Sequence, residues 1–353
     1  MNPLDDERAL RAGDPGGMLD AVTLLPRHCR EGYELGLGAS DLPSADGVEN
    51  VALCGMGGSA IAGDVLRALA ADRLGVPVQV IRAPELPEWC QPHTLLVASS
   101  YSGETAETLA CFEEAVRRGC RVVAVASGGE LGRRAAELEL GRVILPGGFV
   151  PRAAFGYLAL ATLGALEAIG IFPSVRPALD EAVREMEALV AQLAPGLPTA
   201  VNPAKQLAEA IGERMPVVWG AEGIGAVAAS RWKTQLNENG KVPAWSSALP
   251  ELDHNEVVGW SEDRGRGSFL VALRHEGEHP DVAARFGLSI EIAEAAGVRA
   301  QEVWARGRSA LARLLTLVAT GDFTATYLGL AHGADPSEMD AIVGLKRALA
   351  ETR

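Results

Sequence analysis

Residues 95–105 of the chain read LLVASSYSGET, and this stretch decides the fold class. Its first half, Leu95–Ser99, has the length and apolar composition of a buried β-strand. Residues 107–116, which follow the stretch, carry apolar side chains at helical spacing. The pattern predicts a strand that passes through a tight turn into a helix, which is the repeating unit of a parallel sheet covered by helices.

The turn between that strand and that helix is rich in hydroxyl groups, contributed by Ser100, Ser102 and Thr105. At a helix N-terminus the first backbone N–H groups have no partner within the helix, and the helix dipole favours an anion. The turn contains no lysine or arginine, so hydroxyls and amides would hold the anion. This composition favours a sugar phosphate over a nucleoside triphosphate with its metal ion. The competing interpretation is an ordinary Ser/Thr cap of the helix.

The 353 residues carry a formal charge of -14 and an apolar content of 48%, as expected for a soluble globular protein with two domains. An acidic chain disfavours nucleic acid and anionic membranes as partners, whereas a small phosphorylated substrate needs only a local site. The five cysteines form no CxxC pair and the N-terminus does not resemble a signal peptide, so we expect reduced thiols and a cytoplasmic location. The apolar run 157–172, interrupted by Glu167, predicts a buried helix too short to span a bilayer.

Strands and helices alternate through the first half of the chain, after a tail at 1–16 that looks loose and a helix at 18–35. The predicted strands are Val51–Cys54, Val76–Ile81, Leu95–Ser99, Arg121–Ala126 and Val143–Leu145. The predicted helices are 60–71, 104–118, 130–137 and 151–169. Five apolar strands with helical crossovers specify a parallel, doubly wound sheet.

The second half repeats this theme, with VVWGAEG at 217–223 echoing ALCGMGG at 52–58. Its predicted strands are 217–219, 269–273 and 298–303, and its predicted helices are 223–237, 289–296 and 309–319. We therefore expect an α/β protein with two doubly wound domains, each a parallel sheet flanked by helices. The expected segments are an N-terminal tail and helix at 1–34, a first domain with the phosphate-binding turn at 35–175, a connecting helix and linker at 176–200, and a second domain at 201–353.

A second glycine turn, GMGGSA at 55–60, places Ser59 at the start of a helix. The turn also fits a loose dinucleotide fingerprint, which expects an acidic residue at the end of the next strand. That strand ends at Ile81 and Arg82, so NAD is disfavoured and NADP is only just allowed. We favour both turns as walls of one phosphate site at the carboxyl ends of the strands, where such sheets bind ligands.

Three further residues have the chemistry of an active site. Arg152, after Pro151, would stabilise negative charge on a reacting oxygen. Glu238 lies where a helix meets a glycine cap at Gly240, and the helix dipole there is expected to raise its pKa toward that of a useful base. His254 lies among the carboxylates of ELDHNE (251–256), which are expected to favour the imidazolium. For each residue the competing interpretation is an ordinary solvated side chain. The histidines and cysteines have no metal-ligand spacing.

Together these residues resemble the bifunctional phosphoglucose/phosphomannose isomerases of the sugar isomerase (SIS) domain superfamily. The resemblance extends from Asp14 to Lys346, and it is specific because the order and spacing of its parts agree. The parts are Gly57-Gly58-Ser59, residues 100–105, Pro151-Arg152, Asn237-Glu238-Asn239, Asp253-His254-Asn255-Glu256 and Lys346.

The resemblance implies a role for each of these residues. The phosphate would be held by Gly57, Gly58, Ser59, Ser100, Ser102 and Thr105. Glu238 would move a proton between C1 and C2, Arg152 would stabilise the enediolate, and His254 with Lys346 would open the sugar ring. The family's active site lies at a dimer interface, the histidine coming from the partner subunit, and the chemistry needs no cofactor and no metal.

The resemblance implies an aldose–ketose isomerase that acts on glucose 6-phosphate, mannose 6-phosphate or both. Two alternatives stay open at the level of the sequence. One is a sugar-phosphate-binding regulator without catalysis, against which the presence of Glu238, Arg152 and His254 counts. The other is an NADP-dependent oxidoreductase, which depends on the glycine turn at 55–60 alone. An amino-sugar phosphate also stays open as the substrate.

Overall fold

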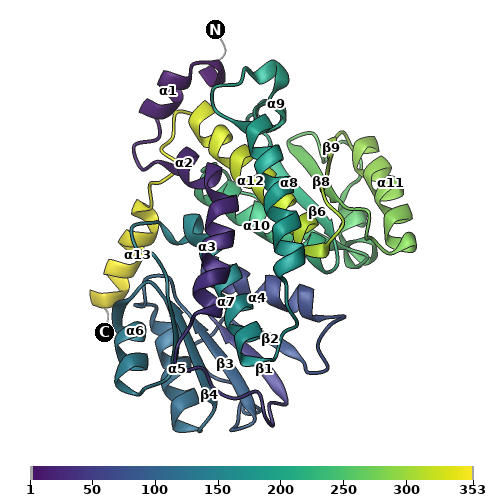
Figure 1. Ribbon diagram of the computed structural model, residues 1–353. Helices are drawn as coiled ribbons and strands as arrows, with labels where there is room; N and C mark the ends of the chain where they lie inside the picture. Colours follow the sequence, from purple (N-terminus) through teal and green to yellow (C-terminus); the bar gives the residue numbers. More distant parts are fainter. Residues whose placement is uncertain (1–2, 352–353) are drawn as a thin grey trace. The chain divides into compact units, whose positions relative to one another are not determined.

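The computed structural model describes residues 3–351, which form two compact units with one sheet each (Figure 1). The β1–β5 unit comprises Leu24–Glu187 and Arg306–Thr316. The β6–β9 unit comprises Met1–Thr23, Ala188–Ala305 and Leu317–Arg353. The expected α/β fold with two parallel sheets is confirmed. The units are not contiguous ranges, however, because the chain passes between them within α8 (Arg176–Leu193) and again within α12 (Ala310–Ala331).

The first sheet has five parallel strands in the order β2-β1-β3-β4-β5. Its strands are β1 (Asn50–Cys54), β2 (Val78–Ile81), β3 (Thr94–Ser99), β4 (Arg121–Ala126) and β5 (Gly141–Ile144). All six residues of β3 are buried, as expected for a central strand covered on both faces. Because β1 and β3 lie side by side in parallel, the glycine turn and the hydroxyl turn that follow them emerge at the same edge of the sheet.

The two faces of this sheet are covered by different helices. Leu53 of β1 lies against Gly63 of α4 (Gly57–Ala70), which packs on α7 (Phe155–Ile169). The neighbouring Ala52 and Cys54 join the core on the opposite face, with α5 (Ala106–Arg117) and α6 (Gly129–Glu137). This alternation follows from the period of two along a strand. In α3 (Leu25–Leu37), a Cβ on Gly36 would lie 2.2 Å from the Ala161 carbonyl oxygen, so this glycine permits the close packing of α3 on α7.

The second sheet has four parallel strands in the order β7-β6-β8-β9. Its strands are β6 (Met215–Ala221), β7 (Trp245–Leu249), β8 (Ser268–Arg274) and β9 (Arg299–Trp304). Its helices are α9 (Pro203–Ile211), α10 (Ile224–Glu238), α11 (Pro280–Ala295), part of α12 and α13 (Asp340–Glu351). Strand β7 was not predicted because its residues WSSAL are half-exposed and mostly polar or small, which gives no buried apolar run.

Residues 1–2 of the tail expected at 1–16 lie outside the described residues, and from Pro3 to Ala12 the segment is mostly helical, so the expectation of a loose tail is wrong there. It forms the 3₁₀ turn η1 (Pro3–Asp5), then α1 (Glu7–Ala12) and α2 (Met18–Thr23). Asp6 caps α1, and the buried Asp14 carboxylate accepts hydrogen bonds from the backbone N–H groups of Met18 and Leu19 at the start of α2. The single helix expected at 18–35 is two helices, with Pro26 in the first turn of α3, where a missing N–H costs little.

Two helices are long and apolar enough to cross a membrane by length and composition, Pro151–Ile169 and Ala310–Ala331. The first was expected to be too short. In both, 83% of the apolar window is buried within the structure, as in core helices of a globular protein. The Pro151 end is the 3₁₀ turn η2 (Pro151–Ala154), so the α-helix begins at Phe155.

Candidate active site

The hydroxyl turn after β3 is a compact hydrogen-bonded unit. The Ser100 and Thr105 hydroxyl oxygens lie 2.8 Å apart, and the Ser100 hydroxyl also accepts from the Gly103 backbone N–H at 3.1 Å. The Ser102 hydroxyl accepts from the Glu104 N–H at 3.2 Å. Gly103 has a φ of +73°, and a Cβ there would lie 2.1 Å from the Gly128 carbonyl oxygen. Only glycine therefore lets this turn lie against the turn that follows β4.

Thr105 is the N-cap residue of α5, but its side chain makes no capping hydrogen bond. Its hydroxyl bonds to Ser100 instead. The ordinary Ser/Thr cap, which was the competing interpretation of this turn, is thus absent at Thr105. The first N–H groups of α5 are free of a side-chain cap and point toward the same edge of the sheet as the hydroxyls, which is the arrangement that binds anions.

The glycine turn after β1 lies beside the hydroxyl turn. The Ser59 hydroxyl is buried and accepts from the Tyr101 backbone N–H at 3.2 Å. A Cβ on Gly55 would lie 2.9 Å from the Ser99 carbonyl oxygen, so this glycine allows the two turns to approach. Gly57 has a φ of +52° and begins α4, which also has no side-chain cap. The β1–β5 unit thus brings Gly57, Gly58, Ser59, Ser100, Ser102 and Thr105 to one edge of its sheet.

Arg152 reaches the same region from η2. A Cβ on Gly58 would lie 3.1 Å from the Pro151 carbonyl oxygen and 3.6 Å from Arg152 Cα, so the backbone of η2 packs on the glycine turn. The competing interpretation of Arg152 as an exposed surface residue is wrong, because its relative exposure is 2%. If the glycine turn binds an anion, as the sequence predicts, a buried guanidinium beside it could stabilise negative charge.

Glu238 is the last residue of α10 in the β6–β9 unit and is half-buried. The helix C-cap is Asn239, which is fully buried, so the expected glycine cap at Gly240 is wrong, and the residue with positive φ is Lys241. A Cβ on Gly329 of α12 would lie 2.1 Å from the Asn239 carbonyl oxygen. The close contact with α12 holds the end of α10, and with it Glu238, in a defined position.

The His254 loop is held at both ends by its acidic residues. His254 is exposed and ends the 3₁₀ turn η4 (Glu251–His254), which precedes η5 (Glu256–Gly259). Asp253 accepts from Ser289 Oγ at 2.7 Å and from Arg285 Nη1 at 3.1 Å, both on α11. Glu256 accepts from the indole N–H of Trp219 at 2.8 Å. These carboxylates, which were expected to act on the imidazole, therefore fasten the loop and leave His254 presented to solvent.

Lys346 lies on α13, whose residues 341–349 are all exposed. Lys241, shortly after Glu238, connects the end of α10 to the segment before α13. Its ammonium bonds to the Glu338 carbonyl oxygen at 2.5 Å and lies 3.5 Å from the Glu338 carboxylate. Glu238, His254 and Lys346 are thus carried by separate elements of the β6–β9 unit, whereas the phosphate turns and Arg152 belong to the β1–β5 unit.

The dinucleotide interpretation of the first glycine turn required Arg82 to face a 2′-phosphate. Arg82 instead forms an ion pair and hydrogen bond with Asp64 of α4. Burial raises the pKa of the Asp64 carboxyl, and the guanidinium opposes that rise. This pairing provides Arg82 with a structural role at the end of β2.

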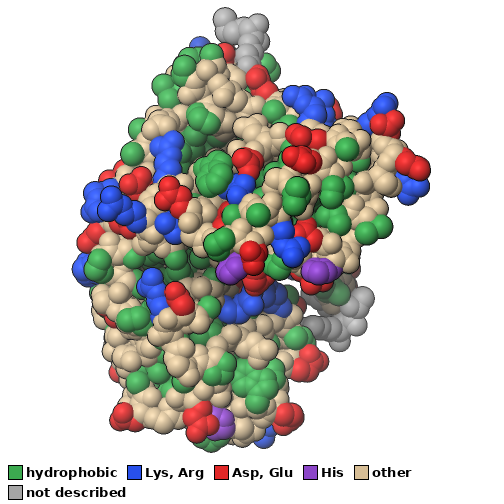
Figure 2. Space-filling model, turned by 90° about the vertical axis from the view of Figure 1, so that its right-hand side faces the viewer, with side chains coloured by type: hydrophobic (Ala, Val, Ile, Leu, Met, Phe, Trp, Pro, Cys, Tyr) green, Lys and Arg blue, Asp and Glu red, His purple; other side chains and the backbone are tan. Residues whose placement is uncertain are grey.

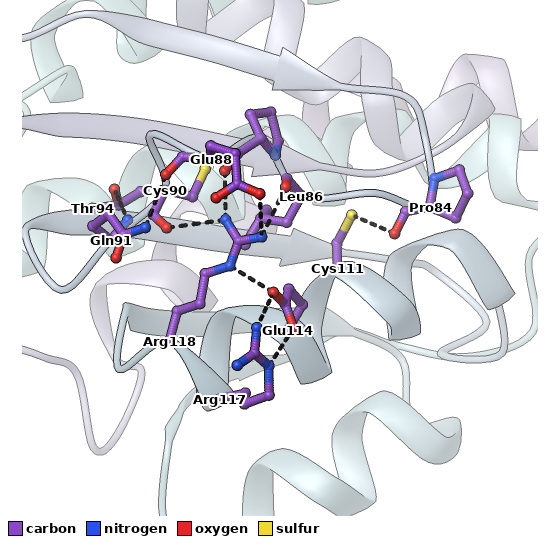
Figure 3. Close-up of polar contacts among 11 residues, drawn as sticks. Pro84, Leu86, Glu88, Cys90, Gln91, Thr94, Cys111, Glu114, Arg117 and Arg118 are labelled. Atoms are coloured by element: carbon purple, nitrogen blue, oxygen red, sulfur yellow. Dashed lines mark hydrogen bonds and ion pairs between the residues drawn. The ribbon is translucent and has the colours of Figure 1, made fainter.

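The segment from β2 to β3 is fastened to the end of α5 by Arg118 (Figure 3). The Arg118 guanidinium donates to the carbonyl oxygens of Leu86 at 3.2 Å and Pro87 at 2.7 Å, and its Nε donates to Glu114 at 2.6 Å. The Cys111 thiol donates to the Ala83 carbonyl oxygen at 3.2 Å. All five cysteines are free thiols and buried, which agrees with the expectation of reduced, core-filling residues.

Acidic and basic side chains are interspersed on the face drawn in Figure 2. That face does not show a continuous basic stripe of the kind that binds a nucleic-acid backbone. Within residues 3–351, no group of three or more His, Cys, Asp or Glu side chains has the geometry of a metal site.

Known proteins resemble the chain over almost its whole length. A profile of the family described as "Bacterial phospho-glucose isomerase C-terminal SIS domain" matches residues 200–349. A bifunctional phosphoglucose/phosphomannose isomerase from Caldicellulosiruptor bescii is 33% identical over 338 residues, which is 95% of this chain and 100% of that relative. A protein of the same name from Thermoplasma acidophilum is 31% identical over 92% of this chain and 100% of its own length.

Among solved structures, a hypothetical protein from Thermus thermophilus matches with a TM-score of 0.74 over 98% of this chain and 93% of its own. The identity between the two is 21%, so this likeness supports the fold alone.

Proposed function

Because the chain belongs to the bifunctional phosphoglucose/phosphomannose isomerase family, and is thus a phosphosugar isomerase, we propose that it interconverts glucose 6-phosphate and mannose 6-phosphate with fructose 6-phosphate. The reaction moves a proton between C1 and C2 of the open-chain sugar through an enediolate. Catalysis of this kind requires a base, a stabiliser of the oxyanion, an acid for ring opening and an anchor for the phosphate.

The phosphate anchor would be the two uncapped turns of the β1–β5 unit. The hydroxyls of Ser59, Ser100, Ser102 and Thr105, with the N–H groups near Gly57, Gly58 and the start of α5, would donate to the phosphate oxygens. A phosphate held far from C1 fixes the reacting carbons relative to the base and so lowers the entropic part of the barrier.

The proton transfer would be carried by the Glu238 carboxylate. It would remove the proton from C2 of the aldose, and the electron pair would pass through the C1–C2 bond onto the C1 oxygen. The Arg152 guanidinium would stabilise the negative charge formed there. Return of the proton to C1, with transfer of the O2 proton to O1, would complete the ketose.

Ring opening would be assisted by His254 and Lys346, which would donate a proton to the ring oxygen and position the hydroxyl that loses one. The enediolate is planar at C2. Reprotonation of C2 on either face therefore yields the glucose or the mannose epimer, which explains how one base could serve both substrates.

The observation that best supports the proposal is the pair of helix N-termini without side-chain caps, one of which has its N-cap hydroxyl bonded across the turn to Ser100. In an ordinary helix start that hydroxyl would satisfy the helix's own N–H groups. We also propose a homodimer in which His254 acts in the partner's site, as the resemblance to the family implies. We assign the enzyme to cytoplasmic carbohydrate metabolism, at the step shared by glycolysis and gluconeogenesis.

The proposal is tested by a coupled assay with fructose 6-phosphate in the presence of a chelator. Glucose 6-phosphate and mannose 6-phosphate are measured separately for the wild type and for Glu238→Gln. We expect both products with the wild type and a loss of turnover of about a thousand-fold or more in the variant, because the amide cannot accept the proton. Glu222→Gln, which changes a carboxylate just before the other end of α10, is the control and should keep wild-type turnover.

If neither product forms while fructose 6-phosphate still raises the melting temperature, the chain binds the sugar phosphate without this chemistry and the proposal fails. If Glu238→Gln retains normal turnover, a different residue is the base.

A further inference from the structure

The loop that leads from β5 to Arg152 has little structure of its own. It reads Pro146-Gly147-Gly148-Phe149-Val150, and its first three residues are exposed. Gly148 has a φ of +95°, in the region that favours glycine. Two consecutive glycines allow this loop many backbone conformations. The residues that follow therefore hold a defined position only if other contacts fix the loop.

That anchor is the phenol of Tyr101. Its hydroxyl donates to the Pro146 carbonyl oxygen at 2.8 Å and accepts from the Phe149 backbone N–H at 3.1 Å. The two bonds bracket the two glycines. Tyr101 is 5% exposed, and burial raises the pKa of its phenol, so the hydroxyl stays protonated and able to donate. The Phe149 ring packs on His28 and Tyr157 and forms a second contact of the loop.

The backbone of Tyr101 is fixed by the turns that surround it. Its N–H donates to Ser59 Oγ at 3.2 Å, and its carbonyl oxygen accepts from the N–H of Ser127 at 2.9 Å and from Ser127 Oγ at 2.7 Å. One residue of the hydroxyl turn is therefore bonded to the glycine turn, to the turn after β4 and to the loop before Arg152.

We infer that Tyr101 is a positioning residue for Arg152: its phenol fixes the 146–150 loop so that the guanidinium is held at a set distance from the phosphate turns. This inference rests on the proposed isomerase reaction. Arg152 is asked to stabilise charge that exists only on the enediolate, so an error in its position affects the transition state more than the bound ground state. The phosphate hydroxyls themselves are not attached to the phenol.

The test is Tyr101→Phe, which removes the hydroxyl and keeps the ring. We expect kcat to fall by about ten- to a hundred-fold, as misplacement of a catalytic group does, with KM changed less than about two-fold. The matched control is Tyr33→Phe. Tyr33 is also buried in the same unit and donates to Glu167 at 2.7 Å, away from the loop. Its kcat should stay at the wild-type value, although both variants lose one buried hydroxyl.

A double-mutant cycle separates positioning from general destabilisation. On an Arg152→Ala background, Tyr101→Phe should lower kcat no further, because the phenol acts through a group that is no longer there. Melting temperatures of all variants are recorded alongside.

Three results would overturn the inference: an unchanged kcat in Tyr101→Phe, an effect confined to KM, or a loss that multiplies with that of Arg152→Ala. Failure of the proposed function is seen separately, as an inactive wild type in the same assay.

Discussion

Single residues decide whether the hydroxyl turn is a binding site or a helix cap. Thr105 occupies the capping position, yet its hydroxyl bonds to Ser100 and leaves the first turn of α5 open. The sequence placed the hydroxyls and the helix start correctly, because both follow from composition and spacing. It could not show which oxygen each hydroxyl would bond to, since that depends on the path of the turn against Gly128 and Ser59.

Thr105→Ala should therefore weaken substrate binding more than catalysis. Loss of one hydrogen bond to a charged phosphate corresponds to an increase in KM of about ten-fold, and kcat should stay within about three-fold. Steady-state kinetics with fructose 6-phosphate measures both. Thr108→Ala, one turn along the same helix, is the control and should leave KM unchanged. A kcat that falls while KM is constant would mean that the Thr105 contact acts mainly in the transition state.

At the scale of elements, the strands of the first sheet were predictable because they are buried on both faces and read as continuous apolar runs. Strand β7 and the N-terminal helices were missed for the opposite reason. WSSAL lies at a sheet edge with only Leu249 buried, and α1 and α2 are too short to show a clear period. The hydrogen bonds that hold η4 through Asp253 could also not be predicted, because their donors Ser289 and Arg285 lie more than thirty residues away in the sequence.

The contact of α5 with the β2–β3 segment, made by Glu114 and Arg118, should make the stability of the fold depend on pH. Hydrogen bonds from Arg117 and Arg118 lower the pKa of Glu114 to about 2. A carboxyl whose pKa is lower in the folded state stabilises the fold above its unfolded pKa, and this stabilisation is lost as the pH falls through the window down to about 2.

Glu114→Gln should accordingly have a lower melting temperature than the wild type at pH 7, and the difference should shrink as the pH falls from 5 to 3. Thermal denaturation followed by circular dichroism across this range measures the effect. Glu107→Gln, at the start of the same helix, serves as the control. A difference that is constant over the range would show that Glu114 contributes through packing and not through its charge.

At the scale of the whole molecule, the residues to which we assign roles in the proposed reaction belong to different units of the chain, and the proposal also assigns His254 to the partner's site. Mixing of inactive variants tests this directly. In a heterodimer of Glu238→Gln with His254→Ala, one site has lost both groups and the other retains both. After subunit exchange of equal amounts, turnover should recover to about a quarter of the wild-type value.

Each variant incubated with itself is the control for this experiment and should stay inactive. Without any recovery after demonstrated exchange, His254 and Glu238 serve the same subunit's site.

Contacts of the N-terminal residues limit how the coding sequence of this protein could be split into parts that fold. The buried Lys205 ammonium donates to the Leu4 carbonyl oxygen at 2.6 Å, and Asp5 accepts from both the N–H and the hydroxyl of Thr199. A gene fragment that encodes residues 188–353 would keep the Pro195 and Leu197 carbonyl oxygens but would leave the buried lysine without the Leu4 carbonyl oxygen, one of its three backbone partners. The second sheet is therefore not an exchangeable module: recombination that moves it should also carry the codons for the helical segment around Leu4 and Asp5.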